Sequence, residues 1–425
     1  MLEQKDVFAK AARRLIPLMV ALYTVAFLDR VNLSFAALTM TKDLSFTPEI
    51  YGWGASIFFW GYFLFEVPSN VVLTRVGARR WICRIMATWS AISGATAFVQ
   101  GPTSFYVLRF LLGLAEAGFA PGMIFYLSLW FPATLRARYA ATYFLAIPLT
   151  SVIGGPLSTL ILELNGFLGL HGWQWLFLIE ALPALVLGIV VFLVLPDGPQ
   201  DAPWLNEDER SAIAMTLASE KGPAHDHIRD VWASLADARV LLLCAVYFAI
   251  VVGLYGITYW LPQMLHTIGF SNAQTGLIIV APYTFAAGAM MLWGRHSDIN
   301  GERIWHVALA ALVSALAFAL SAVSQSPLVM LVALSVAAIG ICATLAPFWA
   351  MPPLFLTGTG AAAGIALINA VGNLGGALGP NLVAWVLQET GSYAGGMAML
   401  SFSLVAGAGL VLAMGRFRRL ALAAS

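Results

Sequence analysis

Charged residues are scarce in this chain. Of its 425 residues, 10% are Lys, Arg, Asp or Glu, whereas 60% are hydrophobic. A soluble globular protein usually has about 25% charged residues, so the composition excludes that class. The shortage of charge indicates a protein whose surface faces lipid.

Cysteine and histidine are scarce too. We interpret Cys83, Cys244 and Cys342 as packing residues, because they lie in or beside hydrophobic runs without metal-site or disulfide spacing. His225 and His227 lie in a polar stretch and are interpreted as solvated. Since the sequence has no nucleophile or metal-ligand cluster and no G-x4-G-K-[ST] loop, it predicts no enzyme, cofactor, metal or ATP site. A net charge of +1 gives no reason to expect a nucleic acid partner.

Long hydrophobic runs are what the chain has in excess. A helix needs about 20 apolar residues to cross a bilayer, and several runs approach or exceed that length. We predict an all-α membrane protein with twelve transmembrane helices, at residues 15–39, 50–74, 82–100, 104–130, 137–162, 174–195, 240–265, 273–293, 305–324, 327–350, 360–388 and 393–415.

Positive charge predicts the orientation of these spans. The first fourteen residues carry no cleavable signal, so the first span is expected to serve as the insertion signal. If the spans alternate from a cytoplasmic N-terminus, nineteen of the 22 Lys and Arg residues are cytoplasmic, Lys42 is outside, and Arg30 and Arg109 lie within spans. Cytoplasmic segments carry such an excess of positive charge. We therefore predict that both termini are cytoplasmic.

A polar stretch at residues 196–239 divides the spans six from six. We predict two six-helix bundles, at 15–195 and 240–415, joined by this stretch as a cytoplasmic linker. Residues 1–14 and 416–425 are predicted to form the cytoplasmic ends of the chain.

The two halves share an internal repeat. Residues recur at a constant offset of 224, namely Gly77 with Gly301, Arg79 with Arg303, Trp81 with Trp305, and Gly155-Pro156 with Gly379-Pro380. Independent matches in one register indicate duplicated halves, as in transporters built from parallel repeats.

The loop after span 8 carries the more complete copy of a repeated motif, Gly294-x3-Asp298-x2-Gly301-x-Arg303. Glycine allows helix ends to approach, and Asp and Arg can pair across the bundles, so we predict that Arg79, Asp298 and Arg303 have a gating role. The alternative is a glycine turn with topogenic charges. Duplicated six-span halves, this motif and the Gly-Pro of span 5 resemble the major facilitator superfamily, which implies two pseudo-symmetric six-helix bundles.

Spans 1 and 4 carry four charged residues: Asp29, Arg30, Arg109 and Glu116. Intramembrane charges are costly and by default mark a functional site. At 1.5 Å per residue, Arg30 lies about 22 Å from the cytoplasmic side and Arg109 about 8 Å from the outside, so both share one level. Arg109 and Glu116 are seven residues apart and share a helix face.

Two arginines at one level suit bidentate capture of a carboxylate, because the planar guanidinium matches its two oxygens. The acids can neutralise the empty site or take up protons. The alternative is a structural ion network of the four residues. We interpret two further buried acids, Glu66 and Glu180, as structural.

Motifs in five spans sharpen the resemblance. LDRVNLSFA, FFWGYFLFEVPSN, RFLLGLAEAGFAPG, GWQWLFLIEALPA and INAVGNLGGALGP resemble the anion:cation symporter family, over about residues 13–415. That family includes bacterial carriers for tartrate, phthalate, hydroxyphenylacetate and sugar acids. The resemblance implies that Arg30 and Arg109 bind substrate and that Asp29 and Glu116 couple protons. It also implies substrate contacts from Tyr62, Trp349 and Asn369.

The sequence therefore predicts a monomeric, multi-pass protein of the bacterial inner membrane that takes up a small organic carboxylate with protons. Where sugar-acid carriers are expected to have polar groups, this sequence has the apolar residues Phe27, Ile147, Ala346 and Phe348. These residues favour a less hydroxylated, aromatic acid as the substrate. An anion antiporter and a sodium-coupled carrier remain as alternatives. A drug exporter would not explain two buried arginines, and a channel would need a continuous polar pore.

Overall fold

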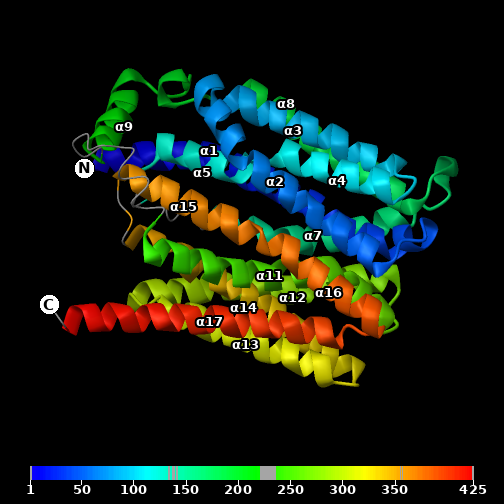
Figure 1. Cartoon of the computed structure of the whole chain (residues 1–425). Coiled ribbons are helices and arrows are strands. Elements are labelled where there is room, and N and C mark those ends of the chain that lie inside the picture. The colour runs from blue at the N-terminus through cyan, green and yellow to red at the C-terminus, as the bar shows by residue number, and fades with distance from the viewer. Residues whose placement is uncertain are drawn as a thin grey trace.

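The computed structural model describes residues 2–132, 135, 139, 142–220, 236–354, 356 and 358–423, and the regular structure in them is helical. The helices form two layers, one from each half of the chain, and both chain ends lie at the same end of the molecule (Figure 1). We call this the termini end and the opposite one the distal end. The all-α fold is confirmed.

Long helices account for the spans predicted in the N-terminal half. They are α1 (Leu2–Asp43), α2 (Pro48–Val76), α3 (Ala78–Ala95), α4 (Pro102–Glu116), α5 (Phe119–Trp130), α7 (Ala146–Leu162) and α8 (Gly172–Val194). The short 3-10 helices η1 (Thr96–Phe98) and η2 (Phe167–Gly169) belong to connections at the distal end.

The C-terminal half repeats this arrangement. Its helices are α11 (Ala238–Thr267), α12 (Asn272–Asn300), α13 (Ile304–Val323), α14 (Pro327–Trp349), α15 (Gly358–Asn373), α16 (Gly375–Thr390) and α17 (Ala394–Ala423), with the 3-10 helix η4 (Pro352–Leu354).

Eleven helical stretches within the described residues are long and apolar enough to cross a membrane. Helix α3 is not among them, because Arg79, Arg80 and Arg84 lie in its first two turns. It nevertheless lies alongside the others, and with it the helices match the twelve predicted spans (Figure 1).

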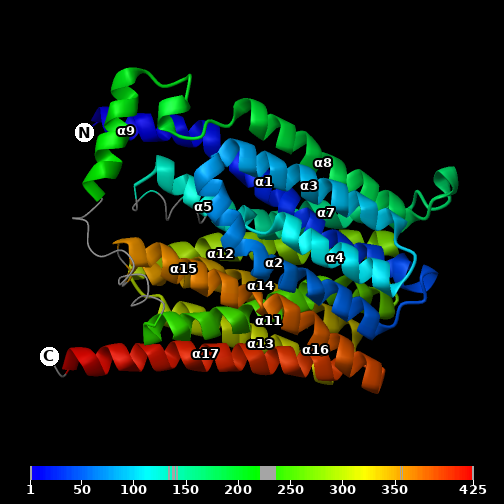
Figure 2. The same cartoon turned by 45° about the horizontal axis from the view of Figure 1, so that its top comes forward.

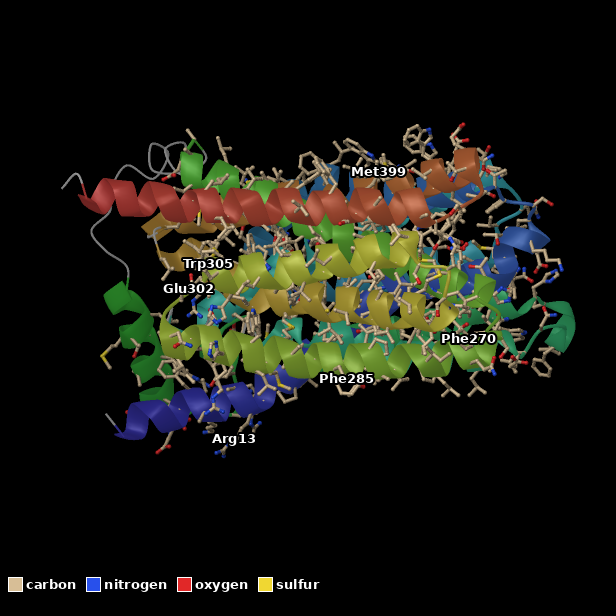
Figure 3. The ribbon with its side chains drawn as sticks, turned by 90° about the horizontal axis from the view of Figure 1, so that it is seen from below. Arg13, Phe270, Phe285, Glu302, Trp305 and Met399 are labelled. Atoms are coloured by element: carbon tan, nitrogen blue, oxygen red, sulfur yellow. The ribbon has the colours of Figure 1, made fainter. Side chains whose placement is uncertain are left out.

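The sides of the molecule are apolar, as a lipid-facing surface requires. Phe285 and Met399 lie on opposite flanks, whereas Glu302 and Trp305 lie near the termini end (Figure 3). Phe285 is 68% exposed, which in an aqueous protein would be an unusual position for a large apolar side chain. These flanks therefore suit the hydrocarbon core of a bilayer.

Two seams hold the halves together, and the internal repeat relates them. Helix α7 packs on α12 and helix α2 on α16, which correspond to spans 5 with 8 and 2 with 11. A Cβ on Gly155 would lie 2.8 Å from the backbone oxygen of Gly276, so α7 and α12 meet backbone to backbone. At the other seam, the Tyr51 hydroxyl donates to the Tyr259 carbonyl over 2.8 Å. The halves are therefore in close contact towards the distal end.

The repeated loop motif has a glycine with positive φ in both halves, although ψ is 153° at Gly77 and 17° at Gly301. Gly77 ends α2 with φ of 95° and Gly301 ends α12 with φ of 62°, both in a region that favours glycine. Arg303 pairs with Asp298 at 2.5 Å within its own loop, because the turn at Gly301 brings them together. Asp298 and Arg303 were expected to pair across the bundles, but among the described residues they pair with each other within one half.

The third predicted gating residue, Arg79, also makes its described contacts within its own half. Its backbone N–H donates to an Asp197 carboxyl oxygen over 2.8 Å, and its guanidinium lies 5.6 Å from the Phe192 ring centroid. The gating role of these residues stays a prediction.

Span 4 is interrupted directly after Glu116. Ala117 leaves the helical conformation with ψ of 136°, Gly118 has φ of 83°, and α5 begins at Phe119. Glu116 is thus the last residue of α4, and the rest of the span is a separate helical segment.

The first part of the predicted linker lies against the N-terminal half. It contains η3 (Pro199–Asp201) and α9 (Glu207–Glu220), and α9 projects beyond the bundle at the termini end (Figure 2). Lys10 pairs with Glu209 at 2.7 Å, and its hydrogen bonds hold the pKa of that carboxyl below its ordinary value. Residues 221–235, with His225 and His227, lie outside the described residues.

Candidate functional site

Close packing of α2 on α4 builds one wall of the site. A Cβ on Gly113 would overlap the backbone of α2 at Phe58, and one on Gly61 would overlap the backbone of α4 at Phe110. These glycines let the two helices approach backbone to backbone. The Phe58 ring is therefore fixed in the core of the N-terminal half, fully buried.

Arg30 of α1 lies at the centre of the molecule with only 4% of its surface exposed. Its Nε and Nη2 atoms lie 2.7 and 2.5 Å from the same carboxyl oxygen of Glu116. Its Nη1 donates to the hydroxyl of Tyr255 over 3.0 Å. Because Tyr255 belongs to α11, the guanidinium links an acid of its own half to a hydroxyl of the other half.

Arg109 of α4 makes a similar connection nearer the distal end. Its Nε donates to the Gly54 carbonyl over 3.1 Å, and its Nη2 donates to the Tyr259 hydroxyl over 3.4 Å. The Cζ atoms of Arg109 and Arg30 lie 5.0 and 5.5 Å from the centroid of the Phe58 ring. The two guanidiniums therefore lie around one aromatic ring, and Arg109 lies about one turn of α11 nearer the distal end, since Tyr255 and Tyr259 are four residues apart.

Glu116 pairs with a neighbouring helix and not along its own. Although Arg109 lies on the same helix seven residues away, Glu116 pairs with Arg30 of α1. Among the described residues, no carboxylate lies within ion-pair distance of Arg109. The reason is geometric, because the long Arg109 side chain turns to the Gly54 carbonyl.

Asp29 also lies apart from the arginines. Successive residues point about 100° apart around a helix, so Asp29 faces α3 while Arg30 faces α4. One carboxyl oxygen of Asp29 accepts hydrogen bonds from Ser93 and, over 3.4 Å, from Asn32. The proposed ion network of four residues is thus only one ion pair, between Arg30 and Glu116.

Of the three other predicted substrate residues, Tyr62 contacts this pair, whereas Trp349 and Asn369 have other partners. Tyr62 places its ring 5.1 Å from the Arg30 guanidinium, and its buried hydroxyl has no hydrogen-bond partner among the described residues. Trp349 of α14 stacks on Phe144 of the other half at 5.9 Å, and its Nε1 is likewise buried without a described partner. Asn369 of α15 donates to a Glu66 carboxyl oxygen over 2.9 Å.

The sequence analysis missed the tyrosines of α11. Tyr255 and Tyr259 bind the two arginines, and Tyr247 packs on Trp349 with ring centroids 4.9 Å apart. Their spacings of eight and four residues place them on one helix face. That spacing was the available signal, because the span is otherwise uniformly apolar.

The interpretation of Glu66 as structural was incomplete, whereas Glu180 fits it. The Glu180 carboxyl accepts from Ser158 over 2.6 Å, and both residues belong to the N-terminal half. The partner of Glu66, in contrast, belongs to the C-terminal half.

The site combines two buried cations, one paired acid and aromatic walls. Its buried hydroxyl and indole groups without described partners are free to donate hydrogen bonds to a ligand. An anion with planar oxygens suits the two guanidinium forks better than any other ligand class. In the described residues no group of three or more acidic, histidine or cysteine side chains could hold a metal ion.

Comparisons with known proteins agree with this description. The model of the Major Facilitator Superfamily matches residues 19–380. A protein of Agrobacterium vitis named as a tartrate transporter is 51% identical over 410 residues, covering 96% of this chain and 95% of that protein. The metabolite transport protein NicT of Pseudomonas putida is 40% identical, with 96% and 94% covered.

Solved structures show the same fold at low sequence identity. A bacterial homologue of the human lysosomal transporter Spinster, in an inward-facing conformation, has a TM-score of 0.72 at 17% identity, with 96% of each chain covered. The Escherichia coli xylose transporter XylE has a TM-score of 0.69 at 16% identity, with 92% and 95% covered. Family and relatives are transporters and not enzymes, as expected, and their multi-pass architecture and bacterial members agree with an inner-membrane location. The chain belongs to the major facilitator superfamily.

Proposed function

We propose that this protein carries a small organic carboxylate across the inner membrane together with protons, by alternating access between its two halves. The observation that carries the proposal is the pair of buried arginines, each bound to a tyrosine hydroxyl of the opposite half. A carboxylate that takes the place of those hydroxyls changes the contacts between the halves. Substrate binding and conformational change then act on the same atoms.

The Arg30–Glu116 pair supports coupling to protons. An incoming carboxylate competes with Glu116 for the Arg30 fork, so a proton on Glu116 favours substrate binding. Each proton that enters with the membrane potential contributes about 2.3 kcal/mol per 100 mV. Asp29, which has no direct contact with Arg30, is proposed as a second proton-carrying group.

The relatives support the class of substrate. The similar protein from Agrobacterium vitis is named for tartrate, a small dicarboxylate. The positive-charge bias supports a cytoplasmic position for the termini end. The linker at 196–239, which joins the bundles at 15–195 and 240–415, is then cytoplasmic as well. We propose that the monomer is the transporting unit, since both arginines and both tyrosines come from one chain.

The test is uptake of labelled tartrate by the purified protein in liposomes. An inward proton gradient is expected to drive accumulation above the external concentration without sodium. Accumulation that requires sodium would favour the sodium-coupled carrier instead. Tartrate uptake that occurs only when the liposomes are preloaded with an anion would favour the antiporter. If uptake of phthalate and of hydroxyphenylacetate also requires preloading, proton symport of this substrate class would be excluded.

A further inference from the structure

The seam between α2 and the α15–α16 segment continues past the arginines towards the termini end. A Cβ on Gly52 would overlap Ala384, and a Cβ on Gly376 would overlap the ring of Phe59. One further step along the two antiparallel segments, Glu66 of α2 accepts a hydrogen bond from Asn369 of α15 over 2.9 Å. This contact therefore joins the halves between the arginines and the termini end.

Glu66 is a buried acid with little compensation. Its side chain is 3% exposed, its Oε1 accepts the bond from Asn369, and its Oε2 is buried without a partner among the described residues. Among those residues, none forms an ion pair with it. Arg30 is the cation that interacts electrostatically with Glu66, and Arg30 is already paired with Glu116. Tyr62 lies one turn from Glu66 along α2.

A charged carboxylate is costly in such surroundings, because one neutral hydrogen bond does not replace its hydration. The protonated carboxyl has a lower cost and keeps an oxygen that accepts from Asn369. When the two halves separate at the termini end, the same carboxyl meets water and can ionise. Its proton is then released on the side to which the site opens.

We propose that Glu66 and Asn369 form a protonation-dependent latch between the halves and that Glu66 carries a proton of its own in each transport cycle. The proposal rests on the proposed proton-coupled function and adds a proton to those carried near Arg30. It also gives Asn369 a second task, because a substrate that binds Asn369 takes it from Glu66 and opens the latch.

Burial alone does not make an acid a coupling group. Glu180 has almost the same surroundings as Glu66, with one hydrogen bond from Ser158 and one buried oxygen without a described partner. Both Glu180 and Ser158 belong to the N-terminal half, so its surroundings move with it. An acid whose partner lies in the other half, in contrast, loses that partner and meets water when the halves separate. Glu180 is therefore a matched control for Glu66.

The experiment compares the protons carried per substrate in variants of the full-length protein in liposomes, with tartrate as the probe. With one pH unit imposed and no membrane potential, each proton lost from the cycle lowers the steady accumulation ratio tenfold. Glu66→Gln keeps an oxygen for Asn369 but carries no proton, so a tenfold lower ratio is expected. Glu66→Asp is expected to restore the ratio, and Glu180→Gln to leave it unchanged.

Exchange of tartrate between preloaded liposomes and the medium shows that each variant is folded and binds substrate. If Glu66→Gln does not fold, Glu66→Met, which fills the same space without a titratable group, takes its place with the same expected loss. An unchanged ratio in the Glu66 variants overturns this inference alone. A loss of equal size in Glu180→Gln also overturns it. Absence of pH-driven accumulation in the unaltered protein overturns the proposed function and this inference together.

Discussion

Substitution of Glu116 by Gln tests whether the acid competes with substrate for Arg30. The carboxylate binds Nε at 2.7 Å and Nη2 at 2.5 Å through one oxygen. Gln keeps the shape and one acceptor oxygen but removes the negative charge. Arg30 is then held more weakly and is more easily taken by the carboxylate of a substrate.

The magnitude follows from the kind of bond that is exchanged. Hydrogen bonds to charged groups contribute about 1.5–3 kcal/mol. Arg30 stays charged, so the bond to the neutral Gln falls at the lower end of this range and the bond to the carboxylate at the upper end. The difference of about 1–1.5 kcal/mol corresponds to a gain in affinity of about five- to thirteenfold. Protonation of Glu116 has the same effect, so substrate binding to the unaltered protein should tighten as the pH falls. Binding to the variant, which lacks this carboxyl, should not show that pH dependence.

Calorimetry of tartrate binding at several pH values measures both effects, and transport assays measure their consequence. Glu116→Gln should exchange tartrate between preloaded liposomes and medium but reach a lower accumulation ratio under a pH gradient, because one proton fewer is carried per cycle. The control is Glu180→Gln, which removes a buried acid that contacts no arginine and should change neither affinity nor its pH dependence.

Two results would contradict these roles of Glu116 in proton coupling and in competition for Arg30. If Glu116→Gln reaches the same accumulation ratio as the unaltered protein, Glu116 does not couple protons and serves only to hold Arg30. If the variant binds more weakly than the unaltered protein, the acid supports the substrate site and does not compete for it.

Three further predictions concern the arginine fork, the orientation and the distal seam. Arg30→Lys keeps the charge but loses at least one charge-assisted bond, so tartrate affinity by calorimetry should fall about 10- to 150-fold; unchanged affinity would exclude a bidentate anchor. A single cysteine at Leu168 should be labelled by an impermeant thiol reagent from outside and one at His225 only from the cytoplasm, and the reverse pattern would invert the span count. Gly276→Ala places a methyl group 2.5 Å from a backbone oxygen of α7 and should slow transport and expose the distal seam to labels, whereas Gly288→Ala, which meets open space, should not; equal effects would contradict the packing argument.

The sequence was sufficient for features that depend on one helix at a time. Runs of about 20 apolar residues gave the spans, since bilayer thickness fixes that length. The rise per residue predicted similar depths for Arg30 and Arg109, and both guanidiniums lie around the Phe58 ring. The repeat identified Gly77 and Gly301 as equivalent positions, and both have a positive φ, which favours glycine.

Contacts between helices could not be predicted in this way. Whether Glu116 meets Arg30 or Arg109 depends on the rotation of α1 and α4 about their axes, which helix spacing alone does not contain. The tyrosines that bind the arginines come from the other half, and no local pattern states which spans face each other. The contact of Glu66 with Asn369 could not be predicted for the same reason, because the two residues are 303 positions apart.

The interruption of span 4 has a mechanical consequence. Arg109 and Glu116 belong to one uninterrupted helical rod, which fixes their axial separation at about 10 Å. The segment that follows the break is joined to this rod only through Ala117 and Gly118. A tilt of α5 at the termini end would therefore be taken up by rotation at these two residues. The distance between Arg109 and Glu116 would stay the same.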